Sequence, residues 1–129
     1  MQEKKKVLII DDEEVHLYTT KGLLDSDHVE VVTYQGSFGA TNCVKGVMPD
    51  LVLLDINMPA LSGENLVSII KPFCAEKKIP IVFYSSNDES TLSNLANIHG
   101  VQGYICKGDM SALRCKVNEY LIASKRDQN

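Results

Sequence analysis

Residues 7–12 read VLIIDD and residues 51–55 read LVLLD. Each stretch is a short apolar run that ends in acidic residues, a pattern typical of a strand buried on both faces of a parallel sheet. Ligands of open parallel sheets bind outside the carboxyl ends of the strands, so Asp11, Asp12 and Asp55 should gather at one edge. Three neighbouring carboxylates repel one another unless a cation lies among them, and oxygen ligands suit Mg²⁺ or Mn²⁺.

Strand-like and helix-like segments alternate along the rest of the chain, and each occurs five times. The predicted strands cover residues 7–10, 29–34, 51–54, 81–84 and 101–106. The predicted helices cover residues 14–24, a segment around 40–47 that Ser37 caps, a segment that starts at Ser62, a segment from Asp88 or Ser90 to Gly100, and residues 111–122. Pro72 should kink or end the third helix, because proline removes a helical hydrogen bond. Residues 125–129 should form a frayed tail.

This alternation predicts a doubly wound α/β fold that fills a single domain over residues 1–129, with its core from about 5 to 122. Polar side chains follow four of the five strands, namely Asp11 and Asp12, then Asp55 and Asn57, then Ser85, then Lys107. One site fed by the first, third, fourth and fifth strands fits a flavodoxin-like five-stranded parallel sheet of order 2-1-3-4-5.

The chemistry of these groups is suited to holding a phosphoryl group. A bound metal ion and Lys107 would neutralise its oxygens, and Ser85 would donate a hydrogen bond to it. A carboxylate can itself act as the nucleophile and form an acyl phosphate, and Asp55 is the candidate because it stands alone at the end of its strand. Taken singly, Asp11 and Asp12 could instead cap a helix, and Ser85 could be an ordinary loop serine.

Composition narrows the classes of function. The formal net charge is -4 and the one basic cluster is Lys4-Lys5-Lys6, which disfavours direct nucleic-acid binding. No apolar run reaches the length of a membrane span and no signal peptide follows Met1, so we expect a cytoplasmic protein. The four cysteines (Cys43, Cys74, Cys106, Cys115) lack CxxC spacing and should be buried, reduced thiols. The three histidines (His16, His28, His99) lack ligand spacing and should be surface or satisfied polar groups.

Four segments together resemble the receiver domain of two-component response regulators, over residues 5 to about 122. They are Ile10-Asp11-Asp12-Glu13, residues 53–59 with Gly63 after them, residues 80–85, and Gly103-Tyr104-Ile105-Cys106-Lys107. The family uses the same order and spacing.

The resemblance implies a role for each matching residue. Asp55 would accept a phosphoryl group from a histidine kinase or histidine phosphotransfer protein. Asp12 would bind Mg²⁺ directly, Asp11 largely through water, and the backbone carbonyl of Asn57 would complete the ligands. The remaining three residues are Ser85, the switch hydroxyl, Tyr104, the switch aromatic, and Lys107, the partner of the phosphate. Tyr104 could also be a half-buried core ring, and Asn87 could contact an attacking water or be a plain loop residue.

The resemblance also implies a signalling switch that catalyses only its own phosphotransfer and slow dephosphorylation, as a monomer or a weak phosphorylation-dependent dimer with an unidentified output partner. The sequence departs from the family at Gly108, where proline is usual, at Ser86, and at His16 and Thr20 in the first helix. These departures leave open a receiver-like interaction module that works without phosphate. A Mg²⁺-dependent aspartyl phosphatase is a further alternative, although Asp11-Asp12 lacks the Asp-x-Asp spacing of that class.

Overall fold

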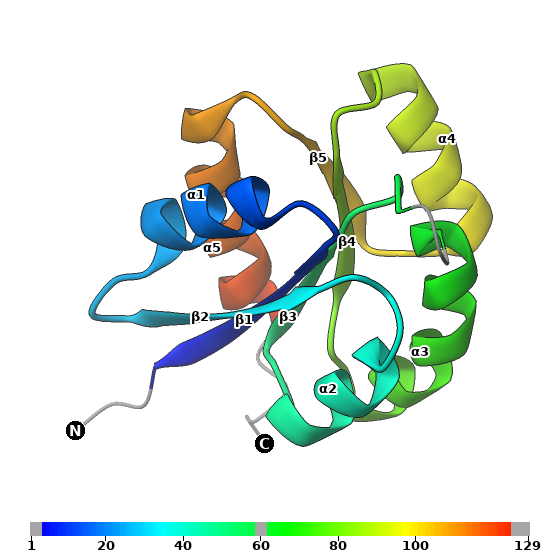
Figure 1. The fold of residues 1–129 in the computed structure, drawn as a ribbon, viewed down its shortest axis with the longest axis horizontal. Helices are drawn as coiled ribbons and strands as arrows, with labels where there is room; N and C mark the ends of the chain where they lie inside the picture. Colours follow the sequence, from blue (N-terminus) through cyan, green and yellow to red (C-terminus); the bar gives the residue numbers. More distant parts are fainter. Residues whose placement is uncertain (1–3, 59–61, 125–129) are drawn as a thin grey trace.

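The structure is a computed structural model that describes residues 4–58 and 62–124. Its strands form one parallel sheet in the order β2-β1-β3-β4-β5, which confirms the predicted topology (Figure 1). The strands are β1 (Lys5–Asp11), β2 (Val29–Gln35), β3 (Leu51–Leu54), β4 (Ile81–Ser85) and β5 (Gly103–Cys106). The helices are α1 (Glu14–Leu24), α2 (Ala40–Val47), α3 (Gly63–Lys77), α4 (Glu89–His99) and α5 (Met110–Ser124). The predicted tail over 125–129, Pro59 and residues 1–3 lie outside the described residues.

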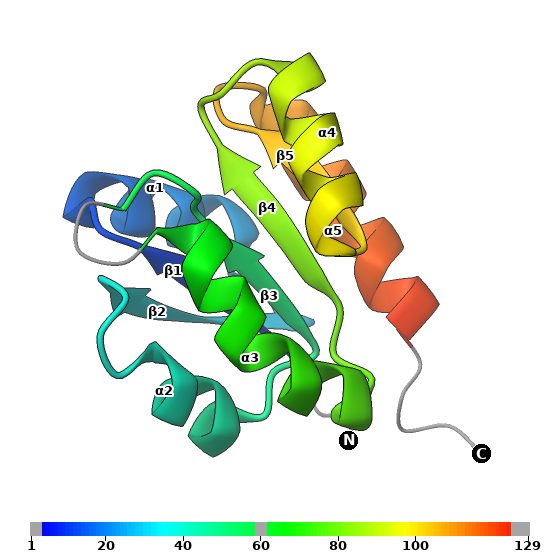
Figure 2. The same ribbon diagram turned by 90° about the vertical axis from the view of Figure 1, so that its right-hand side faces the viewer.

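Helices cover both faces of the sheet. The helices α1 and α5 lie on one face, and α2, α3 and α4 lie on the other (Figures 1 and 2). Alternate residues of β1 serve the two cores: Leu8 and Ile10 pack beneath α2–α4, whereas Val7 and Ile9 pack beneath α1 and α5. A strand buried on both faces needs an unbroken apolar run, which is why this part of the sequence does not alternate with polar residues.

The register of the sheet places the acidic strand ends next to one another. Ile10 pairs with Leu54, Leu54 with Phe83, and Phe83 with Tyr104, so one row crosses the four strands. The next residues of β1 and its neighbour are Asp11 and Asp55, and the Asp55 backbone N–H donates to the Ile10 carbonyl at 3.0 Å. The sheet therefore delivers both carboxylates to the same edge.

Three local predictions were wrong in whole or in part. Pro72 does not end α3, which runs on to Lys77, because its buried face packs on the sheet and Pro72 itself is exposed. Ser37 does not cap α2: the helix begins after Gly39, and the buried Ser37 hydroxyl has no hydrogen-bond partner among the described residues. All four cysteines are free, as predicted, but only Cys74 is buried: Cys43 and Cys106 are half-buried and Cys115 is exposed.

The other helix ends follow the sequence signals. Ser62 caps α3 by accepting the Asn65 N–H, and Asp88 rather than Ser90 caps α4 by accepting the Thr91 N–H. Gly100 ends α4 in the left-handed conformation. Within the described residues, no helix combines the length and the apolar character needed to cross a membrane.

Candidate functional site

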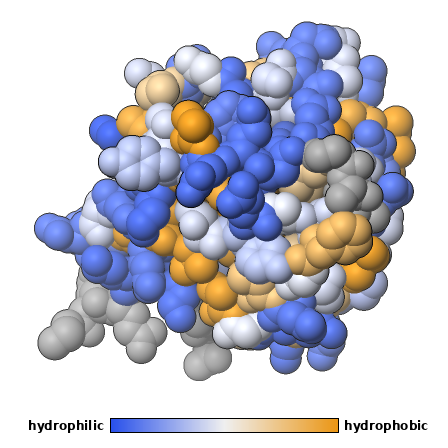
Figure 3. Space-filling model, in the orientation of Figure 1, coloured by the Kyte–Doolittle hydropathy of each residue, from blue (hydrophilic) through white to orange (hydrophobic). Residues whose placement is uncertain are grey.

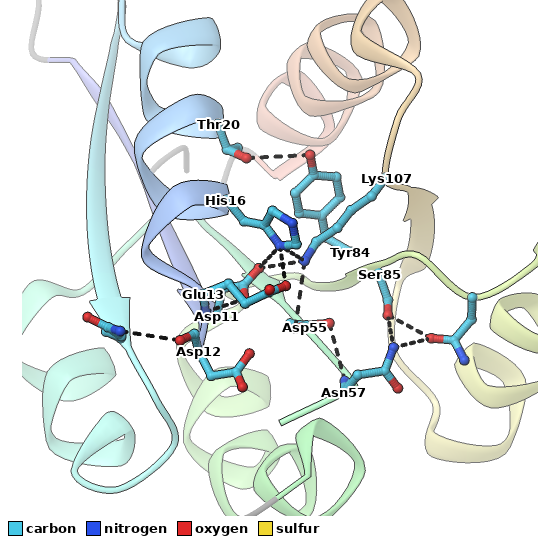
Figure 4. A network of polar contacts seen from close by, with 12 residues as sticks. Asp11, Asp12, Glu13, His16, Thr20, Asp55, Asn57, Tyr84, Ser85 and Lys107 are labelled. Atoms are coloured by element: carbon cyan, nitrogen blue, oxygen red, sulfur yellow. Dashed lines mark hydrogen bonds and ion pairs between the residues drawn. The ribbon is translucent and has the colours of Figure 1, made fainter. Parts of the chain in front are cut away.

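Three carboxylates meet where β1 and β3 end (Figure 4). Asp11, Asp12 and Asp55 each offer an oxygen, and these oxygens lie within 4.8 Å of one another. Asp11 is 1% exposed and Asp55 is 4% exposed, whereas Asp12 is half-buried. In the orientation of Figure 1, hydrophilic side chains gather over the region where these strands end (Figure 3). The three predicted acidic residues are thus brought together, with one of them open to solvent.

The backbone around Asp55 is fixed by a close approach of α3. A Cβ atom at Gly63 would lie 2.2 Å from the Asp55 carbonyl oxygen and 2.8 Å from Ile56 Cα. The Gly63 N–H also donates to the Ile56 carbonyl at 3.0 Å. Only glycine allows the start of α3 to lie this near the end of β3, so Gly63 helps to set where Asp55 stands.

Lys107 directly follows β5, the edge strand of the sheet, and reaches the acidic cluster from there. Its Nζ atom lies 2.6 Å from Asp11 Oδ2 and 3.7 Å from Asp55 Oδ2, and its side chain is 11% exposed. The described residues contain no cis peptide bond, and Gly108 adopts φ 104°. Glycine tolerates this left-handed backbone, so the chain brings Lys107 to the site although proline does not follow it.

Burial and charge move the pKa values of the two inner carboxyls in opposite directions. Desolvation raises the pKa of Asp55 to about 6; the nearby Lys107 charge opposes this rise and the Asp11 charge adds to it. Burial also acts to raise the pKa of Asp11, but the hydrogen bonds from Lys107 and from the Glu13 N–H outweigh it and leave that pKa below its ordinary value. At Asp55, therefore, the charge of Lys107 does not offset the desolvation of the carboxylate.

The donor set fits a hard divalent cation. Asp11, Asp12 and Asp55 carry up to three negative charges in one partly buried cluster, and Lys107 supplies one positive charge. Carboxylate oxygens are the ligands that Mg²⁺ and Mn²⁺ take in proteins. A divalent ion at this place would supply the missing positive charge.

Ser85 is held by two asparagines. Its hydroxyl donates to Asn87 Oδ1 at 2.7 Å and accepts from Asn57 Nδ2 at 3.0 Å. Asn57 Nδ2 also lies 2.8 Å from Asn87 Oδ1, while the Asn57 backbone N–H donates to Asp55 Oδ1 at 3.2 Å. The structure thus links Asn57, Ser85 and Asn87 beside Asp55, and it gives Asn87 a definite contact that the sequence left open.

Tyr104 lies in β5 and is half-buried. Its hydroxyl donates to Glu89 Oε2 of α4 at 3.1 Å, and Lys116 Nζ of α5 lies 5.5 Å from the centre of its ring. The half-buried ring packs against the core beneath α2–α4, and its hydroxyl ties it to α4.

His16 is a site residue that the sequence did not predict. Its Nδ1 atom lies 2.9 Å from Lys107 Nζ and 3.6 Å from Asp11 Oδ2 (Figure 4). The usable signal was its position, since a residue in the first turn of α1 stands directly above the preceding acidic pair. Gln35, at the end of β2, was also missed and donates to the Asp12 carbonyl at 3.3 Å.

Comparison with known proteins gives a consistent result. The response regulator receiver domain family matches residues 7–118. The chain is 30% identical to protein PilG of Pseudomonas aeruginosa over 102 residues, which cover 79% of this chain and 76% of PilG. A response regulator receiver domain protein (CheY-like) from Methanospirillum hungatei has the same fold, with a TM-score of 0.84, 21% identity and coverage of 97% of this chain and 99% of that one.

Other relatives are much longer than this chain. Protein RcaC of Microchaete diplosiphon is 30% identical over 102 residues, which cover 79% of this chain but 16% of RcaC. The match thus concerns the receiver unit and not the rest of such proteins. Because the family match extends over most of the chain and the sheet order and acidic strand ends agree with it, the chain belongs to the response regulator receiver domain family of two-component signalling.

Proposed function

We propose that this receiver is a phosphoacceptor switch and that Asp55 accepts the phosphoryl group. A carboxylate oxygen of Asp55 attacks the phosphorus of a phosphohistidine on a histidine kinase or histidine phosphotransfer protein. The phosphorus–nitrogen bond breaks, its electron pair stays on the imidazole, and an acyl phosphate forms on Asp55. The observation that carries this proposal is the buried Asp55 carboxylate beside Asp11, Asp12 and Lys107.

The surroundings of Asp55 suit a nucleophile. Its raised pKa of about 6 leaves it ionised at neutral pH but more basic than an ordinary aspartate. Asp11, Asp12, Asp55 and the backbone carbonyl of Asn57 would hold Mg²⁺ or Mn²⁺, which when bound offsets the negative charge of the phosphoryl oxygens. Lys107, whose Nζ atom lies 3.7 Å from Asp55 Oδ2, adds a fixed positive charge beside Asp55.

The phosphoryl group would then shift the conformational population. It brings about -1.5 to -2 charges into the site. Ser85 gains by turning its hydroxyl from Asn87 towards a phosphoryl oxygen, and Lys107 gains the phosphoryl oxygens as partners beside Asp11. Tyr104 leaves Glu89 and turns inward into the space that Ser85 vacates. The surface of α4, β5 and α5 is repacked, and an output partner reads it.

Incubation with Mg²⁺ and acetyl phosphate, followed by intact mass measurement, tests the proposal. We expect the gain of one phosphoryl group in the native chain and none in Asp55→Asn. Phosphoryl transfer to another residue, or no transfer under any condition, would leave the interaction module that works without phosphate. Continuous turnover of a generic phosphate ester would favour the aspartyl phosphatase instead.

A further inference from the structure

His16 contacts Lys107 but takes no part in the proposed phosphotransfer. His16 Nδ1, in the first turn of α1, lies 2.9 Å from Lys107 Nζ (Figure 4). An ammonium group has three N–H donors and no acceptor, so His16 must accept and its ring proton must lie on Nε2. The Lys107 side chain is 11% exposed, so little water is available to replace this acceptor.

Glu13 competes for the same imidazole atom. Its Oε1 lies 3.0 Å from His16 Nδ1, and Nδ1 cannot donate to Glu13 while it accepts from Lys107. Glu13 is 61% exposed, and water can satisfy its carboxylate. The Lys107 side chain is only 11% exposed and its ammonium group can act only as a donor, so the bond to Lys107 decides the tautomer.

The position of Lys107 follows from these contacts. Asp11 takes one N–H at 2.6 Å and His16 takes a second, which leaves the third for Asp55 Oδ2 at 3.7 Å. The Tyr84 ring lies against the same ammonium group, 5.5 Å from Nζ, and its hydroxyl lies 3.4 Å from Thr20 Oγ1 of α1. His16 and Thr20, the two residues of α1 at which the sequence departs from the family, thus both lie on the Lys107 side of the site.

We infer that His16 is a positioning residue that holds the Lys107 ammonium group and aims it at Asp55. Because its imidazole is an uncharged acceptor, it fixes Lys107 without adding a negative charge that would repel an incoming phosphoryl group. A carboxylate at this position would hold Lys107 equally well but would compete with the phosphoryl group for its charge. This inference rests on the proposed phosphoryl transfer to Asp55.

Two variants separate positioning from packing. His16→Leu keeps an apolar body but removes the acceptor, whereas His16→Asn places an amide oxygen close to where Nδ1 stands. With acetyl phosphate and Mg²⁺, we expect phosphorylation of His16→Leu to be slower by about fivefold, the weight of one hydrogen bond, and His16→Asn to recover most of the rate. Val15→Ala, an exposed change on the same turn, should keep the native rate.

A double-mutant cycle makes the test specific. In a Lys107→Ala background, His16→Leu should cause no further loss of rate, because there is no ammonium group left to position. A native rate in His16→Leu, no recovery in His16→Asn, or an undiminished effect in the Lys107→Ala background would each overturn the inference.

The resting contact can be measured without phosphorylation. Imidazole ¹⁵N shifts of the unphosphorylated protein should show the Nε2–H tautomer at His16, and that signal should change in Lys107→Ala. An Nδ1–H tautomer would overturn the inference directly. If this contact is seen but the native chain gains no phosphoryl group, the failure lies in the proposed function, on which the inference also depends.

Discussion

Replacement of Asp55 by asparagine should stabilise the metal-free protein at neutral pH, although it removes the proposed phosphoacceptor. Asp55 is 4% exposed, and desolvation raises its pKa to about 6 from the ordinary value of 3.8. Its carboxylate therefore opposes folding when it is ionised. Asparagine has nearly the same shape and carries no charge.

The magnitude follows from the pKa. A gap of roughly two pKa units corresponds to about 3 kcal/mol at a pH above both values. The buried amide group of asparagine needs new hydrogen-bond partners, which reduces this stabilisation by about 1 kcal/mol. We expect Asp55→Asn to raise the free energy of unfolding by about 1–2 kcal/mol at pH 7.5, or to shift the urea midpoint by roughly 1 M.

The stabilisation by Asp55→Asn should increase as the pH rises. A raised pKa favours the folded state while the group is protonated, so the benefit is complete below 3.8 and is lost as the pH rises through about 6. The difference in free energy of unfolding between Asp55→Asn and the native chain should therefore be small at pH 4 and grow between pH 4 and 7.

Urea unfolding followed by circular dichroism in EDTA, at pH values from 4 to 7.5, measures this difference. Asp27→Asn is the matched control, because Asp27 is exposed and its replacement removes the same charge. That control should move the free energy of unfolding by no more than about 0.5 kcal/mol. The reasoning fails if Asp55→Asn is less stable than the native chain at pH 7.5, or if the difference is the same at both ends of the pH range.

Three further predictions concern the same part of the fold. Gly63→Ala should lower the free energy of unfolding by about 1–3 kcal/mol, because its Cβ would meet the Asp55 carbonyl; an unchanged thermal melt would contradict this. Ser37→Ala should raise stability by about 1 kcal/mol, since the buried hydroxyl has no partner, and urea unfolding that shows a loss would count against it. Mg²⁺ at 100 times its Kd should stabilise the protein by about 2.7 kcal/mol in thermal denaturation, and Asp12→Ala should lose most of this gain. Equal gains in both proteins would exclude Asp12 as a ligand.

The wrong predictions of helix ends share one cause: tertiary packing outweighs the local conformational preference of single residues. Proline is a strong helix breaker, yet α3 continues past Pro72 because Leu66, Ile70 and Cys74 anchor it to the sheet. Serine is a common helix cap, yet Ser37 lies buried and α2 starts later. In both cases the sequence named the correct element and misjudged its end.

The amino-acid sequence by itself determined the α/β class, the strand order and the meeting of Asp11, Asp12 and Asp55. These depend on short-range signals, namely buried apolar runs and the polar residues directly after them, together with the rule that parallel strands end at a common edge. A pattern of this kind needs no knowledge of side-chain directions.

Only the tertiary structure decided which groups touch within that edge. The contacts of Lys107 with Asp11 and His16 join residues 96 and 91 positions apart, and the Ser85 hydroxyl donates to Asn87 Oδ1. Such choices depend on rotamers, on the close approach that Gly63 permits and on burial, which is the largest cause of the raised pKa of Asp55. None of these is a property of a residue and its sequence neighbours, so they appear only when the helices pack on the sheet.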